Sequence, residues 1–155
     1  MSVEEAAYAE VDGYRVAVER SYDPDTHVWA CVLAPDRVRI GMDPLGVETS
    51  GTLAQLSFLP LGTPLRRGQS FGGLEAAKFV GPLTSPLTGV LTACNEAVLN
   101  NPGLPEVDPY EEGWLVELAP TAMDTELAML VSGSDIVPWF TQRLADYRLK
   151  GVIAQ

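Results

Sequence analysis

Lys78 is the residue of this chain whose type and position best suit covalent chemistry. It is the only lysine in the first 149 residues, and the only other lysine, Lys150, lies five residues from the end. All other basic side chains are arginines. A primary amine can be acylated, whereas a guanidinium stays protonated. A chain that needed lysine only for solubility would scatter it, so this usage favours an attachment point for a carried group.

The residues on either side of Lys78 predict a tight, exposed turn between two strands. Gly72-Gly73 come before the lysine and Gly81-Pro82 come after it. Glycine and proline are the residues that most favour turns, because they adopt the required backbone angles at little cost. The lysine is therefore expected at the tip of a hairpin, where both a modifying enzyme and later partners can reach it.

Short strands and brief helices must position this hairpin. Twelve prolines and fourteen glycines divide the chain into short pieces, which favours a mainly β fold. Asp43-Pro44 resembles an N-cap followed by proline at the first helical position, so a short helix should begin there and end at Gly51. The other expected strands are Val28–Leu33, Val38–Gly41, Leu53–Leu59, Val90–Cys94 and Gly113–Leu118. A short helix is expected at Asn95–Asn100, and a proline-rich loop at Asn101–Tyr110.

The C-terminal part is helical in character. Asp124–Val131 is expected to form one helix, and Ser134-Asp135 to cap a second. In the second helix, three bulky residues recur at helical spacing on one stripe: Phe140, Leu144 and Tyr147. This stripe is expected to pack against the β body rather than to bind a partner.

The composition limits the classes of function. A length of 155 residues suits one domain, and 46% hydrophobic residues can fill its core. A net charge of −11 and a pI near 4.3 argue against partners such as nucleic acid or an anionic membrane. No secretory signal or membrane span is apparent, so a cytoplasmic protein is expected. No Ser/His/Asp set, phosphate loop or metal-ligand spacing appears, so the chain alone is not expected to be an enzyme.

The two cysteines and the single histidine are interpreted as structural. Trp29, Cys31 and Leu33 should share one face of a strand. Cys31 and Cys94 both fall in apolar strand-like runs and should behave as small core residues, although a thiol that reacts with the carried group is an alternative. His27 stands beside an aromatic strand, where a histidine is more often structural than catalytic.

From His27 to about Pro120 the chain resembles the lipoyl-carrying H proteins of the glycine cleavage system. Five segments match motifs of that family in order and with similar spacing: His27-Val28-Trp29, Glu75-Ala76-Ala77-Lys78, Ser85-Pro86-Leu87-Thr88-Gly89, Asn95-Glu96-Ala97, and Asp108-Pro109-Tyr110-Glu111-Glu112-Gly113-Trp114. Other swinging-arm carriers fit less well, because biotin carriers place methionine on both sides of the lysine. Lipoyl domains of 2-oxoacid dehydrogenases usually place an aspartate before it.

The resemblance implies a fold, a cofactor and a role for two residues. The fold is a barrel-sandwich hybrid of two small antiparallel sheets with short helices, expected here as a carrier domain over residues 27–120. An N-terminal extension (residues 1–26) and a helical C-terminal segment packed on the domain (121–155) are deviations from the family. Lipoate would be amide-linked to Lys78 as a swinging arm, and Glu75 would contribute to recognition by a lipoate ligase or the lipoyl synthase machinery. Tethering raises the effective concentration of the cargo at each partner's site without tight binding.

The departures from the family concern the cargo. By resemblance, the positively charged amine of an aminomethyl cargo is held by the glutamate of His-Glu-Trp and by an aspartate four residues after the lysine. Here those positions are Val28 and Pro82, and the bulky Phe79 follows the lysine. Loss of both acids suggests a cargo that is not a cation, because a buried ammonium needs such partners.

Three function classes therefore stay open. The first is an H-like lipoate-binding protein of cytoplasmic sulfur oxidation, which carries sulfur for a heterodisulfide-reductase-like complex. The second is a glycine cleavage H protein that carries the aminomethyl group between the glycine cleavage enzymes. The third is an unmodified interaction domain that keeps the fold.

Overall fold

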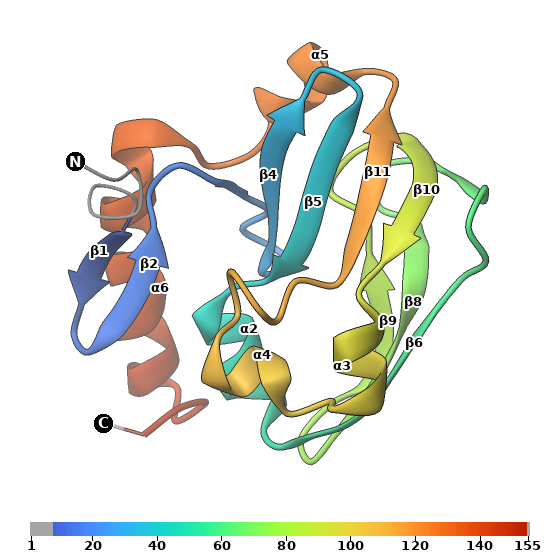
Figure 1. The fold of residues 1–155 in the computed structure, drawn as a ribbon. Helices are drawn as coiled ribbons and strands as arrows, with labels where there is room; N and C mark the ends of the chain where they lie inside the picture. Colours follow the sequence, from blue (N-terminus) through green and yellow to red (C-terminus); the bar gives the residue numbers. More distant parts are fainter. Residues whose placement is uncertain (1–7, 155) are drawn as a thin grey trace.

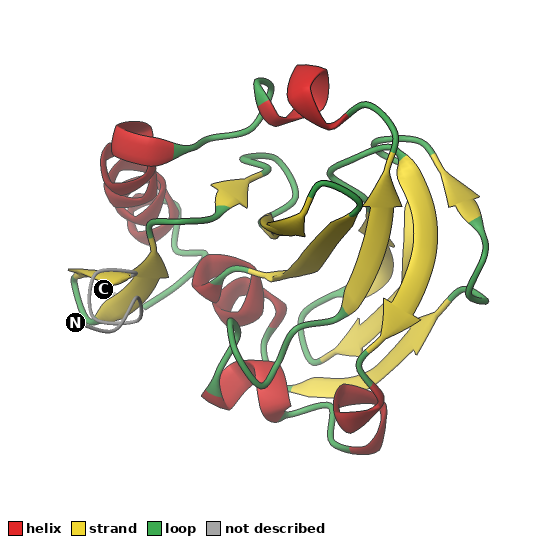
Figure 2. Ribbon diagram, turned by 45° about the horizontal axis from the view of Figure 1, so that its top comes forward, coloured by secondary structure: helices red, strands yellow, loops and turns green. Residues whose placement is uncertain are grey.

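Two antiparallel sheets form the body of the molecule in a computed structural model that describes residues 8–154 (Figures 1 and 2). The larger sheet has six strands in the order β3-β4-β5-β11-β10-β7: Ser21–Tyr22, Val28–Ala34, Arg37–Met42, Val116–Pro120, Gly89–Cys94 and Pro64–Leu65. The smaller has the order β6-β8-β9: Leu53–Phe58, Ser70–Ala76 and Val80–Thr84. Side chains of both sheets share one core, including Ile40, Phe71 and Leu118, each fully buried. This arrangement confirms the expected mainly β barrel-sandwich hybrid.

Strand β4 separates this first core from a second one. Because successive side chains of a strand point to opposite faces, Val28 and Ala30 pack into the first core, while Trp29 and Cys31 pack into the second. The indole Nε1 of Trp29 donates to the carbonyl of Met42 at 3.0 Å, which satisfies its polar atom. Leu33 was expected on the same face but is exposed, because it lies beyond the second core and next to a bulge in the β4–β5 pairing.

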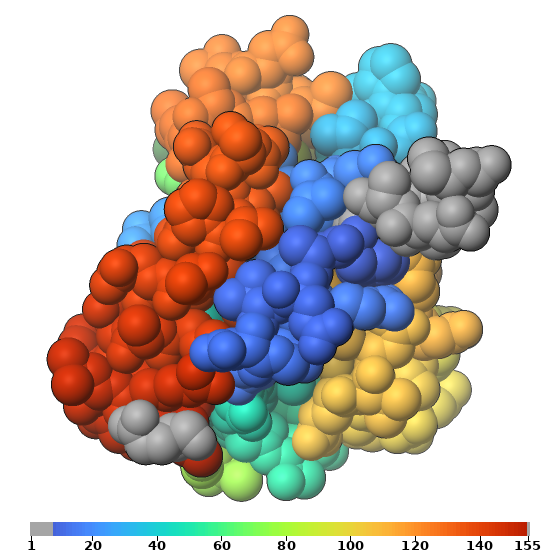
Figure 3. Space-filling view, turned by 90° about the vertical axis from the view of Figure 1, so that its left-hand side faces the viewer, coloured from blue at the N-terminus to red at the C-terminus, as the bar shows by residue number. Residues whose placement is uncertain are grey.

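The second core joins the two ends of the chain. A hairpin of β1 (Tyr8–Val11) and β2 (Tyr14–Ala17) packs beside α6 (Ile136–Leu149), as Figures 1 and 3 show. Phe140 and Leu144 of the expected stripe are buried in this core together with Trp29. The stripe therefore packs as predicted, but against the hairpin and the outer face of β4 rather than against the first core. Residues 1–7 of the expected N-terminal extension lie outside the described residues.

The remaining helices are short. They are α2 (Pro44–Ser50), α3 (Glu96–Asn100), α4 (Leu104–Val107) and α5 (Met123–Leu127), and a single 3₁₀ turn, η1 (Gly133–Asp135), precedes α6. Helix α2 follows the prediction, since the Asp43 side chain accepts from Gly46 N–H and Gly51 ends the helix. The expected loop at Asn101–Tyr110 was wrong in part, because it contains α4 with Pro105 in its first turn. Within residues 8–154, no helix combines the length and the apolar character needed to cross a membrane.

A buried carboxylate ties β5 to β11. Glu117, 5% exposed, accepts from Arg37 Nε at 2.8 Å and from Arg39 Nε at 2.9 Å. Burial alone would raise the pKa of this carboxyl, but its hydrogen bonds to the two arginines outweigh burial and hold the pKa below its ordinary value. The charge of Glu117 therefore stabilises the folded state.

Replacing Glu117 with glutamine is expected to destabilise the protein by about 1–2 kcal/mol at about pH 7, since charge-assisted hydrogen bonds are lost and solvent screens the exposed Arg37. A carboxyl whose pKa is depressed by folding stabilises above its unfolded pKa, and this contribution disappears as the pH falls through the folded pKa. Urea unfolding should therefore show the two proteins converging below about pH 4. The exposed Glu112→Gln serves as control, and a difference that does not change with pH would contradict this account.

Candidate functional site

Lys78 lies at the tip of the β8–β9 hairpin. The link between the strands is Ala77-Lys78-Phe79, closed by a hydrogen bond of 2.8 Å from Ala76 N–H to the carbonyl of Phe79. All three link residues are exposed, and so is Glu75, which pairs with Val80 at the last register position of the hairpin. The amine of Lys78 is thus presented to solvent, as the glycines and proline around it predict.

The base of this turn is fixed to the end of α2. Ala77 N–H donates to the carbonyl of Thr52 at 2.9 Å, and Lys78 N–H donates to the carbonyl of Ser50 at 2.8 Å. The backbone passes so close that a Cβ at Gly51 would lie 3.2 Å from Lys78 Cγ. Gly51 also has φ +78°, a conformation that favours glycine. A flexible side chain is therefore mounted on a rigid main-chain anchor.

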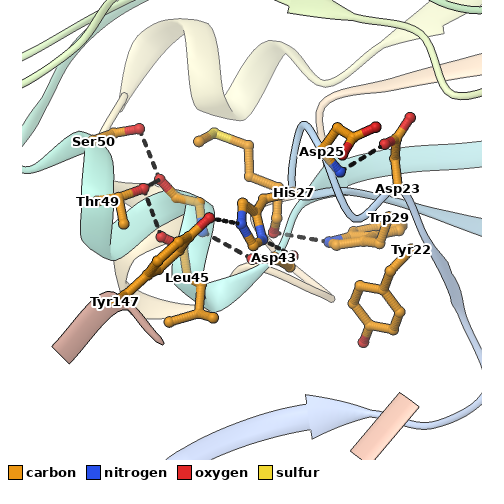
Figure 4. Close-up of polar contacts among 12 residues, drawn as sticks. Tyr22, Asp23, Asp25, His27, Trp29, Asp43, Leu45, Thr49, Ser50 and Tyr147 are labelled. Carbon is orange, nitrogen blue, oxygen red and sulfur yellow. Dashed lines mark hydrogen bonds and ion pairs between the residues drawn. The ribbon is translucent and has the colours of Figure 1, made fainter. Parts of the chain in front are cut away.

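The other end of α2 is held by a chain of buried hydrogen bonds (Figure 4). Asp43, fully buried, accepts from Gly46 N–H at 2.8 Å and contacts His27 Nδ1 at 2.8 Å. His27 Nε2 lies 2.6 Å from the hydroxyl of Tyr147 on α6. A carboxylate only accepts, so Nδ1 of His27 donates to Asp43. Both ring nitrogens are thus engaged, which confirms the structural interpretation of His27.

A cleft of about 390 Å³ lies between α2 and the β8–β9 hairpin. It brings together Val28 and Pro82, the two positions where acids are missing, with Phe79 beside them. Val28 is buried and Pro82 is exposed. The rest of the wall combines apolar side chains of both sheets with uncharged or weakly basic polar ones. The apolar side chains are Met42, Leu74 and Leu83, and the polar ones are Thr26, His27, Thr49, Ser50 and Thr84. Among the described lining residues the one carboxylate is that of Asp25, which is exposed and hence well hydrated.

The ring of Phe79 can lie over the neighbouring strand because residue 81 is glycine. A Cβ at Gly81 would stand 2.9 Å from Phe79 Cζ, well inside contact distance. The chain thus combines a bulky residue after the lysine with a missing side chain two positions later. Sequence reasoning identified Phe79 but not its dependence on Gly81, since a glycine in a hairpin is ordinarily explained by the turn itself.

Neither cysteine lies beside the lysine. Cys31 packs against the second core and Cys94 against the first, and neither lines a cavity next to Lys78. This supports their interpretation as core residues over the alternative of a reactive thiol. Within the part of the chain that the structure describes, no group of three or more His, Cys, Asp or Glu side chains could hold a metal ion.

Known proteins resemble this one in sequence and in structure over most of the chain. The family model described as "Glycine cleavage H-protein" matches residues 20–142. "Glycine cleavage system H protein 2" of Aquifex aeolicus is 30% identical over 140 residues, covering 88% of this chain and 84% of the relative. "Glycine cleavage system H protein 5" of the same organism is 30% identical over 129 residues, covering 81% and 87%. The crystal structure of a glycine cleavage system H protein from Mycobacterium marinum superposes with a TM-score of 0.63 at 32% identity, covering 68% of this chain and 87% of that one.

Proposed function

The chain belongs to the glycine cleavage H-protein family, and from this premise we propose that it carries lipoate on Lys78 and that the cargo of the arm is sulfur. Proteins of this family carry lipoate covalently on a lysine and act as carriers for other enzymes. The cofactor supplies the exchange chemistry of a dithiolane, while the protein supplies position.

Lys78 is supported as the attachment site by its exposure at a hairpin tip whose backbone is fixed to α2. A rigid base and a flexible arm together let one cofactor reach several partners in turn. Glu75 is exposed on the strand that leads to the lysine, where a lipoate ligase or the lipoyl synthase machinery would contact it. We assign Glu75 to recognition by that enzyme.

The observation that carries the sulfur proposal is the cleft that Phe79 lines next to Lys78, where neither Val28 nor Pro82 supplies an acid. An aminomethyl cargo brings an ammonium group, and placing an ammonium against apolar walls is costly unless a carboxylate accompanies it. Here Val28 and Pro82 occupy the wall, and the exposed carboxylate of Asp25 is screened by water. A sulfur cargo has no amine to neutralise, so it does not need the two acids that are missing at Val28 and Pro82.

Loading with sulfur needs only thiol exchange. A thiolate of the dihydrolipoyl arm attacks the outer sulfur of a donor persulfide, the S–S bond of the donor breaks, and the donor leaves as a thiolate. One persulfide is consumed and one is formed on the arm, so no external oxidant is required. The partner that receives this sulfur would be a complex of the heterodisulfide-reductase-like class, which acts in the cytoplasm.

The second candidate is the aminomethyl carrier of glycine cleavage itself. Its support is the family, whose relatives bear that name. The two Aquifex aeolicus relatives are numbered 2 and 5, so one organism holds several such proteins, as expected if they serve different systems. The two candidates share the lipoyl arm and differ in the cargo.

The lipoylated protein is expected to be a poor substrate for glycine decarboxylase and aminomethyltransferase, and the double variant Val28→Glu, Pro82→Asp should improve transfer. The gain should be at most about thirtyfold, because two charges that contribute about 0–1 kcal/mol each add up to about 2 kcal/mol at most. The matched control Val80→Glu, on an exposed valine outside the cleft, should give no gain. Turnover of the unchanged protein at the rate of an ordinary H protein would return it to glycine cleavage.

The sulfur step is tested by intact mass. After reduction of the arm, incubation with a low-molecular-weight persulfide should add the mass of one sulfur to the lipoylated protein. The octanoylated protein, which lacks the thiols, is the matched control and should gain nothing. Equal gain by both forms would place the sulfur on a cysteine and contradict the proposal. Complete failure of a lipoate ligase to modify the chain would leave the unmodified interaction domain as its function.

A further inference from the structure

We propose that the lipoyl arm has a second seat, in a groove of about 800 Å³ on the opposite side of α2 from the cleft. The inference rests on the proposed attachment of lipoate to Lys78. The groove is lined by α2, by residues 105–110 around α4, and by the turn of the β1–β2 hairpin, together with Ala77 and Lys78. Figure 3 shows the hairpin in blue, α2 in teal and the segment around α4 in gold meeting on one face.

The direction of the Lys78 side chain points to this groove. Its Cγ lies over Gly51, at 3.2 Å from where a Cβ of that glycine would stand, and both residues line the groove and not the cleft. Phe79, the next residue, lines the cleft and not the groove. The hairpin tip therefore divides its side chains between two cavities, with the acylatable amine on the larger one.

The groove offers an apolar strip to an uncharged chain, bordered by the charged side chains Arg15, Glu48, Glu106 and Asp108. Its volume is within the range of about 300–1,000 Å³ that is typical of small-molecule sites. Pro44, Val47 and Val107 supply apolar wall, and the side chain of Val107 is 85% exposed when nothing covers it. An eight-carbon acyl chain with an oxidised dithiolane carries no charge, so burying it against these residues needs no ionic partner.

The carboxylates of the groove already have partners. Glu48 accepts from the hydroxyl of Tyr14 at 2.9 Å, and Glu106 accepts from Leu53 N–H at 3.2 Å. Asp108 accepts three backbone N–H bonds, from residues 110, 111 and 112. Although burial opposes it, these bonds keep the pKa of Asp108 below its ordinary value. Each acid is therefore held by the protein itself, which leaves the apolar wall for the arm.

Part of this groove lies outside the segment that matches the family model. The residues of the hairpin that line it, Gly13, Tyr14 and Arg15, precede the segment that matches the family model, which begins at residue 20. The cleft is built from residues within the matched segment. The second seat therefore lies partly outside the segment that matches the family model, at the position where the side chain of Lys78 leaves its anchor.

Nuclear magnetic resonance of the holo-protein tests the seat directly. We compare the lipoylated protein with the unmodified chain and expect shifts of the methyl groups of Val47 and Val107 and of the ring of Tyr14. Contacts from the lipoyl protons to the same groups are expected as well. Shifts confined to cleft residues such as Met42 and Leu83, or to the hairpin tip alone, would overturn the inference while leaving lipoylation intact. Absence of a lipoyl adduct would overturn both proposals.

A pair of variants gives an independent measurement. Val107→Glu places a charge in the groove, whereas Val80→Glu places one on an exposed valine outside it. The thiolate of dithiothreitol attacks the dithiolane, and it does so faster when the arm is free; Val80→Glu controls for the effect of the added charge on this thiolate. The Val107→Glu holo-protein should therefore be reduced about twofold faster or more. If the arm occupies the groove half of the time, releasing it doubles the fraction of the arm that can react. Equal rates for the unchanged protein and both variants would overturn the seat.

Discussion

Replacing Lys78 with arginine is expected to abolish lipoylation. Arginine keeps the positive charge and the exposed position, but its guanidinium is not acylated, so intact mass after treatment with a lipoate ligase should show no adduct. The backbone anchor at Ser50 and Thr52 involves only main-chain atoms of the turn, so the fold should be unchanged.

Lys150→Arg is the matched control, because it removes the other lysine of the chain. This variant should accept one lipoyl group at the rate of the unchanged protein. An adduct that persists on Lys78→Arg and is lost from Lys150→Arg would move the attachment site to the C-terminus. Such a result would remove the role proposed for the hairpin tip.

Asp43→Ala is expected to cost about 1.5–5 kcal/mol of stability. It removes the cap of α2, a loss of about 0.5–2 kcal/mol, and leaves the buried Nδ1 of His27 without its acceptor, a loss of about 1–3 kcal/mol. Urea unfolding followed by tryptophan fluorescence, to which the buried Trp29 contributes, measures the change.

Two other variants separate the parts of this effect. Tyr147→Phe removes only the far hydrogen bond of the chain and should cost about 1 kcal/mol. Asp25→Ala changes an exposed aspartate nearby and should stay within about 0.5 kcal/mol of the unchanged protein. If Asp43→Ala were no worse than Asp25→Ala, some other contact would be holding α2 in place.

Features that depend on neighbours in the sequence were predictable. Asp43-Pro44 predicted the start of α2, because a cap acts within one helical turn. The glycines and the proline around Lys78 predicted the hairpin for the same reason. The last strand was expected to begin at Gly113 but begins at Val116 and ends at Pro120. An apolar run indicates which residues are buried, but not where the first hydrogen bond between strands forms.

Features that join distant residues were not predictable from local patterns. His27 and Tyr147 are 120 positions apart, and nothing in either segment indicates the other. Gly51 ends a helix in any interpretation of the sequence, yet its close contact with Lys78 appears only when the two turns meet. That Val28 and Pro82 belong to one site was inferred from the family resemblance. The structure supports this inference, because both residues line the same cleft.

The anchor of the hairpin tip has an evolutionary consequence. All three hydrogen bonds that hold the tip, from residues 76, 77 and 78, join main-chain atoms. Substitutions at the tip therefore change what the side chains select without changing how the arm is presented, and Gly51 carries most of the constraint. The position of the arm, which the main chain sets, and the choice of cargo, which the side chains set, can therefore change independently in evolution. One scaffold can then be duplicated and its copies reassigned to different metabolic systems, with few mutations and no intermediate that loses the arm.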